Sequence, residues 1–229
     1  MSTTPRDRPI PFSEAEVRAI LEGRKTQTRR VAKPPPKAVF LPDDQWKIDV
    51  DEPGTAYMDD ESGRLRITCP YGQPGDQMWL RETWALVHNW EEDGIDDWEG
   101  AIPKDRPISP SAQVWHKAGH LRSSDTVEDR GFRWRPSIHM PRWASRITLE
   151  ITRVRVERVQ DITEADAKAE GVSPVMVDSG GFTQWDAPID IPDYIEPFAD
   201  LWDKLNAPRG HGWSVNPWVW VIDFERIKP

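Results

Sequence analysis

The stretch Ile147–Val159, with the sequence ITLEITRVRVERV, decides the fold because it is the clearest strand in the chain. Apolar and polar residues alternate from Ile147 to Thr152, which is typical of a strand with one buried face. The apolar positions then move to Val154 and Val156, so the alternation has shifted by one residue. A shift inside a long strand indicates a bulge or a bend, and strongly curved barrels need such bends. The stretch therefore predicts one strand of a small, curved β-barrel.

Two short helices are predicted, one before this strand in the sequence and one after it. Ser13 and Glu16 form a capping-box pattern, so we expect a helix of about three turns over residues 14–22. Thr163 occupies the same capping position at the start of a second helix, which Gly171 ends.

The C-terminal part of the sequence adds a third helix and a last strand. Apolar residues recur at helical spacing from Ile195 to Leu205, whereas Trp218–Phe224 is almost continuously apolar. A continuous apolar strand implies burial on both faces. Short helices interleaved with a few curved strands predict an α+β fold, in which short helices flank the barrel.

Three stretches without a clear period predict long loop insertions into a single domain of residues 1–229. They lie near residues 37–64, 88–131 and 172–191, and the first contains at most a minor hairpin. The 22 prolines of the 229-residue chain fit this amount of irregular connection.

Composition excludes several classes of protein. Only 37% of the residues are hydrophobic, and no run approaches the ~20 apolar residues of a membrane-spanning helix. The polar N-terminal residues do not resemble a signal peptide, and the one cysteine, Cys69, allows no internal disulfide. We therefore expect a cytoplasmic protein with no membrane contact, no metal site and no cofactor.

Charge is unevenly distributed along the chain, whose formal net charge is −9. Basic residues are concentrated in residues 1–37 and again in residues 133–158, whereas residues 89–100 are acidic and contain no basic residue. Separated basic stretches in an acidic protein indicate a local anion site, and solvated basic faces are the alternative.

Four stretches in chain order, Gly23–Arg30, Pro74–Asp76, Ile162–Gly171 and Trp218–Phe224, together resemble the ASCH family of the PUA-like superfamily. Gly23–Arg30, with the sequence GRKTQTRR, resembles the signature G-x-K-x-x-T-x-R that opens the family. Pro74–Asp76 before a strand, the helix Ile162–Gly171 after a long strand, and the closing strand Trp218–Phe224 are similar to its later elements. The resemblance covers about half of the chain, and it implies a PUA-like barrel.

The resemblance also implies a reaction. The best-understood relatives are small bacterial N4-acetylcytidine amidohydrolases, which use a Lys, a Thr and a Glu. By motif, these residues correspond to Lys25, Thr28 and Glu170. The implied function is removal of an acyl group from an N4-acylated cytidine or a related modified nucleoside.

Amide hydrolysis needs a nucleophile, a base that activates it, an acid for the leaving nitrogen and donors for the oxyanion. In one version Thr28 is the nucleophile, Lys25 is its base, and Glu170 orients the lysine or protonates the departing amine. In the other, Glu170 activates a water molecule while Thr28 and Lys25 hold the carbonyl oxygen. The sequence leaves both versions open. A solvated lysine, a strand threonine and a helix-end glutamate are the ordinary alternative.

Seven further residues are candidates for holding a nucleoside or RNA. Guanidinium groups bind phosphate or a base edge with forked donors, indole rings stack on bases, and His and Glu exchange protons. The candidates are Arg30, Trp79, Arg81, Glu82, His139, Arg142 and Trp143. Each has a structural alternative, such as core packing for a tryptophan or a salt bridge from Glu82 to Arg81.

Two other functions compete with the amidohydrolase. Other ASCH proteins bind RNA, and some are reported to cleave it, so RNA is the alternative partner. The chain also resembles phage- and prophage-encoded ASCH members, which share the stretches Trp79–Trp84 and Arg135–Trp143. A phage-encoded protein acts in the host cytoplasm, and a phage interaction protein with a relict site is the third interpretation.

Overall fold

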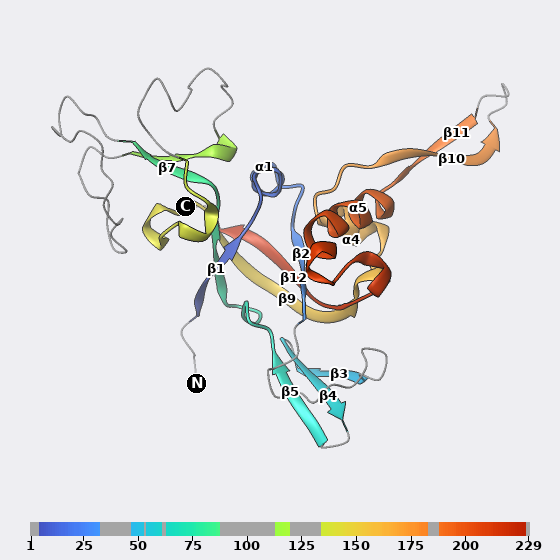
Figure 1. Ribbon diagram of the computed structural model, residues 1–229, viewed down its shortest axis with the longest axis horizontal. Coiled ribbons are helices and arrows are strands. Elements are labelled where there is room, and N and C mark those ends of the chain that lie inside the picture. The colour runs from blue at the N-terminus through green and yellow to red at the C-terminus, as the bar shows by residue number, and fades with distance from the viewer. Residues whose placement is uncertain are drawn as a thin grey trace. The chain divides into compact units, whose positions relative to one another are not determined.

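Figure 1 shows the computed structural model of the chain. The structure describes residues 5–32, 47–52, 54–60, 63–87, 113–119, 134–182 and 188–227. The chain divides into two compact units. The first comprises residues 1–21, 76–150 and 226–229, and the second comprises residues 22–75 and 151–225.

The first unit combines strands from separate segments of the chain. Its elements are β1 (Asp7–Pro11), α1 (Glu14–Leu21), β6 (Gln77–Arg81), β7 (Trp84–Val87), β8 (Gln113–His116), the short 3-10 helices η2 (Lys117–Gly119), η3 (Ser137–His139) and η4 (Arg142–Ala144), and the start of β9 (Thr148–Arg158). β1 pairs with β6 in parallel, and the first residues of β9 pair with β6 in the antiparallel direction. β7 and β8 form a separate antiparallel pair.

The core of this unit follows from the alternation of side chains along β6. Met78 and Leu80 lie on one face of that strand, with Leu149 opposite Met78 and Ile10 opposite Leu80. All four side chains are at most 1% exposed. A second cluster is centred on the fully buried Trp84.

Among the residues that the structure describes, the second unit carries most of the helices and hairpins. Its elements are β2 (Gln27–Val31), β3 (Lys47–Glu52), β4 (Thr55–Asp60), β5 (Gly63–Thr68), the rest of β9, η5 (Val159–Asp161), α4 (Glu164–Ala169), β10 (Val175–Phe182), β11 (Pro188–Asp193), α5 (Ile195–Asn206), η6 (Ala207–Arg209), η7 (Trp213–Val215) and nearly all of β12 (Trp218–Ile227). β12 pairs with β2 in the antiparallel direction. Two smaller sheets, β3-β4-β5 and β10-β11, are antiparallel.

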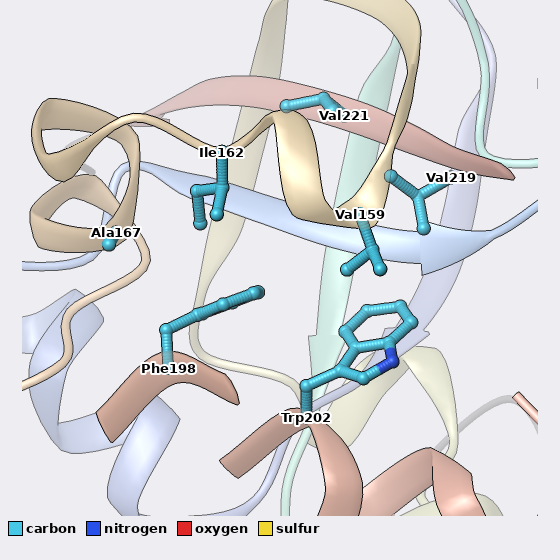
Figure 2. Close-up of a cluster of buried hydrophobic side chains, with 7 residues drawn as sticks. All are labelled: Val159, Ile162, Ala167, Phe198, Trp202, Val219 and Val221. Atoms are coloured by element: carbon cyan, nitrogen blue, oxygen red, sulfur yellow. The ribbon is translucent and has the colours of Figure 1, made fainter. Parts of the chain in front are cut away.

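Helix α5 packs its apolar side chains against one face of the sheet of this unit. Figure 2 shows Phe198 and Trp202 of α5 pointing toward Val219 and Val221 of β12. Val159, Ile162 and Ala167 complete this buried cluster. The predicted third helix is therefore present, and it buries Phe198 and Trp202. Its other apolar side chains Leu201 and Leu205 are exposed.

The predicted closed barrel is wrong, and the fold is mixed α/β with an open sheet. In the described part of the chain, the main sheet has five strands in the order β1-β6-β9-β12-β2, so β1 and β2 are its two edges. The phase shift in β9 is present, because Thr152 and Arg153 are both exposed between the buried Ile151 and Val154. Such a shift requires a bend of the strand, but an open twisted sheet accommodates a bend as well as a barrel does.

The predicted insertions contain more regular structure than their composition indicated. Residues 47–52, 55–60 and 63–68 are the strands of the three-stranded sheet β3-β4-β5, where at most a minor hairpin was predicted. Residues 175–193 form the hairpin β10-β11, apart from residues 183–187, which lie outside the described part. Of the stretch 88–131, the structure describes only residues 113–119.

The helices that the structure describes are all too short or too polar to cross a lipid bilayer.

Candidate active site

Main-chain pairing brings Lys25 next to Glu170, although 145 residues separate them. Gly23 precedes the lysine with φ +75°, a left-handed turn that glycine adopts without strain. The chain then runs extended along the end of α4, where Lys25 forms a β-bridge with Glu170 and the Thr26 N–H donates to the Ala169 carbonyl at 2.8 Å. Glu170 is the C-terminal cap residue of α4, so the helix end fixes its position.

Lys25 and Glu170 form a buried ion pair. The lysine Nζ donates to Glu170 Oε2 at 2.6 Å and to the Glu170 carbonyl oxygen at 3.0 Å. The two side chains are only 2% and 6% exposed. Charges removed from water in this way are stable only when they are paired and hydrogen-bonded, and this pair is both.

Arg29 extends the pair into a network. Its side chain is fully buried, and its Nη1 lies 3.4 Å from Glu170 Oε1. Its Nη2 lies 3.4 Å from both Glu157 Oε2 and Asp166 Oδ2. Nη1 also donates to the Gln27 amide oxygen. Glu170 therefore has Lys25 on one carboxylate oxygen and Arg29 on the other.

Arg155 joins three of the carboxylates of this network. Its guanidinium donates to Asp223 and Asp166 at 2.8 Å and also to Glu157. Burial lowers the pKa of Arg155, but these three carboxylates outweigh it, and the pKa is raised.

Asp166 has a pKa of about 2, below its ordinary value of 3.8. Burial acts in the opposite direction, toward a higher pKa. Hydrogen bonds from Gln27 and Thr163 and the charges of Arg29 and Arg155 overcome that effect and hold the carboxylate ionised.

The alternation of side chains along the strands explains why these groups meet. Gln27 and Arg29 lie on one face of β2, and Asp223 lies opposite Gln27 on β12, where the two hydrogen-bond at 2.6 Å. Arg155 and Glu157 are two residues apart on β9 and so share a face. The network comprises three cations, Lys25, Arg29 and Arg155, and four carboxylates, Glu157, Asp166, Glu170 and Asp223.

Thr28 lies on the other face of β2. It is 2% exposed and sits opposite Ile222 of β12. In the part of the chain that the structure describes, no hydrogen bond joins its hydroxyl to Lys25 or Glu170. Arg30 shares this second face, where it is half-buried opposite Trp220.

The other candidate binding residues belong to the first unit, and three of them form a stack. The Trp79 side chain is 6% exposed, and the guanidinium carbons of Arg81 and Arg142 lie 4.6 and 5.8 Å from its ring centroid. Arg142 Nε donates to Asp7 at 2.6 Å, and Arg81 Nη1 donates to the Ile138 carbonyl at 3.1 Å. Burial lowers the pKa of Arg81.

Glu82, a candidate binding residue, is paired with Arg146 and not with the neighbouring Arg81, its structural alternative. It is 1% exposed and accepts two hydrogen bonds from Arg146, at 2.9 and 3.0 Å. Trp143 meets the buried Trp84 edge to face at 6.0 Å, whereas His139 is exposed in η3. Glu82 and Trp143 thus make structural contacts in this conformation.

Sequence reasoning missed the rest of the network, whose members are Gln27, Arg29, Arg155, Glu157, Asp166 and Asp223. Asp166 is the third residue of the helix that Thr163 caps, and its carboxylate accepts from the Thr163 hydroxyl at 2.8 Å and from the Thr163 N–H at 3.4 Å. The available signal was Asp223, a carboxylate inside the strand Trp218–Phe224 that is predicted to be buried on both faces. Within the described ranges, no three His, Cys, Asp or Glu side chains are grouped to hold a metal ion.

Comparison with known proteins gives no relative: no protein-family model, no curated protein and no solved structure matches this chain.

Proposed function

We propose that this protein is an amidohydrolase that removes the acyl group from an N4-acylated cytidine or a related modified nucleoside. One observation carries the proposal: Lys25 Nζ and Glu170 Oε2 lie 2.6 Å apart. Lys25 and Glu170 are two of the three residues that the resemblance to the ASCH family implies as catalytic. They are 145 residues apart in the chain, so their contact does not follow from closeness in the sequence.

The geometry favours the version in which Glu170 activates a water molecule. A carboxylate is a suitable general base for water, and the adjacent Lys25 ammonium is a suitable donor for the carbonyl oxygen as negative charge develops on it. Glu170 then returns the proton to the departing cytidine amine. Water attack needs only the two groups that are already in contact.

The version with Thr28 as nucleophile asks more of the chain. Its hydroxyl lies on the other face of β2, opposite Ile222, while the network that includes Glu170 lies on the face of Gln27 and Arg29. Proton transfer requires near hydrogen-bond contact, so this version requires a rearrangement of β2. We therefore assign Thr28 no proton-transfer step.

The proposed reaction requires a nucleoside to reach the buried Lys25–Glu170 pair. Because both side chains are almost fully buried, a nucleoside reaches them only when part of the surrounding chain moves. Movement of loops around a reactive centre is common in enzymes and also excludes water from it.

RNA is the weaker candidate because much of the predicted basic surface is neutralised. Within residues 133–158, Arg142 pairs with Asp7, Arg146 with Glu82, and Arg155 with three carboxylates. Nucleic-acid affinity depends on cations that are available to phosphates.

The test is cytidine release from N4-acetylcytidine by the purified protein. Lys25→Ala should abolish the release. Lys168→Ala removes an exposed lysine from the last turn of α4, the helix that Glu170 caps, and should leave the release unchanged. Absence of release by the folded wild-type protein refutes the proposal and favours RNA or a relict site. Equal release by Lys25→Ala refutes the assignment of the site.

A further inference from the structure

Arg29 stands out among the charged residues of the second unit, because its side chain has no exposure at all. Burial of a guanidinium is costly and is retained only where several acceptors compensate it. Its acceptors are Gln27, Glu157, Asp166 and Glu170. Its ring neighbour is Phe198, whose centroid lies 5.8 Å from the guanidinium carbon.

The arginine also differs from the cation in the proposed reactive pair. Lys25 contacts Oε2 of Glu170 closely, at 2.6 Å, whereas Arg29 approaches Oε1 at 3.4 Å. Arg29 is a planar group held by partners on β9, α4 and its own strand, and its Nε is buried with no hydrogen-bond partner in the described structure. Such a group is fixed in place and has donor capacity left over. A lysine has a flexible stem and a single point charge, and it does not reproduce this arrangement.

We propose that Arg29 is the positioning residue of this site, which orients the Glu170 carboxylate by holding Oε1 and leaves Oε2 for Lys25 and the proton. The inference rests on the function proposed above, but its central readout does not require activity. Arg29 contacts Oε1 of the Glu170 carboxylate and acts on the reaction only through Glu170.

Loss of Arg29 has a defined electrostatic consequence. Glu170 loses one of its two cationic neighbours, while Glu157 and Asp166 stay close to the vacated position. Fewer cations and unshielded carboxylates both favour the protonated form of Glu170.

The experiment is a carbon-13 NMR titration of the full-length protein labelled at the glutamate side-chain carboxyls, with the Glu170 signal assigned from Glu170→Gln. Arg29→Met should move the Glu170 midpoint to higher pH, because one of the two cations beside the carboxylate is lost. Arg158→Met is the matched control, because Arg158 is also an arginine of this unit but contacts the Asn216 carbonyl and the Trp218 ring. It should leave the Glu170 midpoint unchanged.

Arg29→Lys is the second variant, for the case in which Arg29→Met does not fold. It keeps one charge and loses the fork, so it should shift the midpoint in the same direction by a smaller amount. An unchanged Glu170 titration in the folded variants overturns the inference.

The pH profile of cytidine release separates this inference from the proposed function. With an active wild-type protein, the acid limb of the profile should move upward in Arg29→Met by the same interval as the NMR midpoint. An NMR shift in a protein without activity supports the positioning role and refutes the amidohydrolase. Activity without an NMR shift supports the amidohydrolase and refutes the positioning role of Arg29.

Discussion

At the scale of single residues, the site depends on charges that are stable only together. Lys25 and Glu170 are buried against one another, and Arg29 touches the same carboxylate. Removing one member of a buried pair leaves the other charge uncompensated, which costs about 3–5 kcal/mol. Removing both members is far less costly, because no lone charge remains.

This contrast gives a stability prediction for the pair. Lys25→Met and Glu170→Gln should each lower the free energy of unfolding, and the double variant should lose clearly less than the sum of the two. Urea unfolding of the four proteins measures the coupling. Strict additivity would mean that the two side chains do not interact in solution.

The lowered pKa of Asp166 affects how the stability of the protein depends on pH in the acid range. Its pKa is lowered from 3.8 to about 2 in the folded protein. A lowered carboxyl pKa contributes stability that is fully present above pH 3.8 and is lost as the pH falls toward 2. Asp166→Asn should therefore flatten the loss of stability across that window, as followed by thermal unfolding at each pH. An unchanged slope would show that Asp166 is not held ionised by its partners.

Thr28 distinguishes the two versions of the reaction. If water is the nucleophile, Thr28→Ala should retain measurable cytidine release, with a loss well below that of Lys25→Ala. If the hydroxyl attacks the substrate, Thr28→Ala should be inactive, and only Thr28→Ser should retain activity. Initial rates of the three variants at saturating N4-acetylcytidine decide between them.

At the scale of helices and strands, periodicity predicted the elements well. The helix from residue 14, the long strand of residues 147–159 and the last strand are present as α1, β9 and β12. The network was not predicted, because pairing between strands decides which polar residues meet. Gln27 and Asp223 are adjacent only because β2 and β12 pair in one particular register.

Thr163 links helix capping to the site. Its hydroxyl accepts from the Asp166 N–H at 3.1 Å, at the start of the short helix that ends at Glu170. Thr163→Ala should lower the free energy of unfolding by about 1 kcal/mol, as caps of this kind usually contribute. Thr163→Ser, which keeps the hydroxyl, should lose much less in the same denaturant titration. Equal losses in the two variants would contradict the capping role.

At the scale of the whole molecule, the sequence could not predict how the strands join. The phase shift in β9 is real, but the same bend serves a closed barrel and an open sheet, so local pattern did not distinguish them. Closure depends on whether the edge strands pair, which is a property of long-range register. The proline-rich stretches were similarly misleading, since residues 47–52, 55–60 and 63–68 are the strands of the sheet β3-β4-β5.

We propose that the Glu170 carboxylate, paired with Lys25, activates water for attack on an acylated cytidine. The most direct measurement is the rate of cytidine release from N4-acetylcytidine by the full-length protein and by Glu170→Gln, each shown by circular dichroism to be folded. We expect release by the wild type and a loss of at least about a hundredfold in the variant, the usual contribution of a general base. Equal rates, or no release by the wild type, would contradict it.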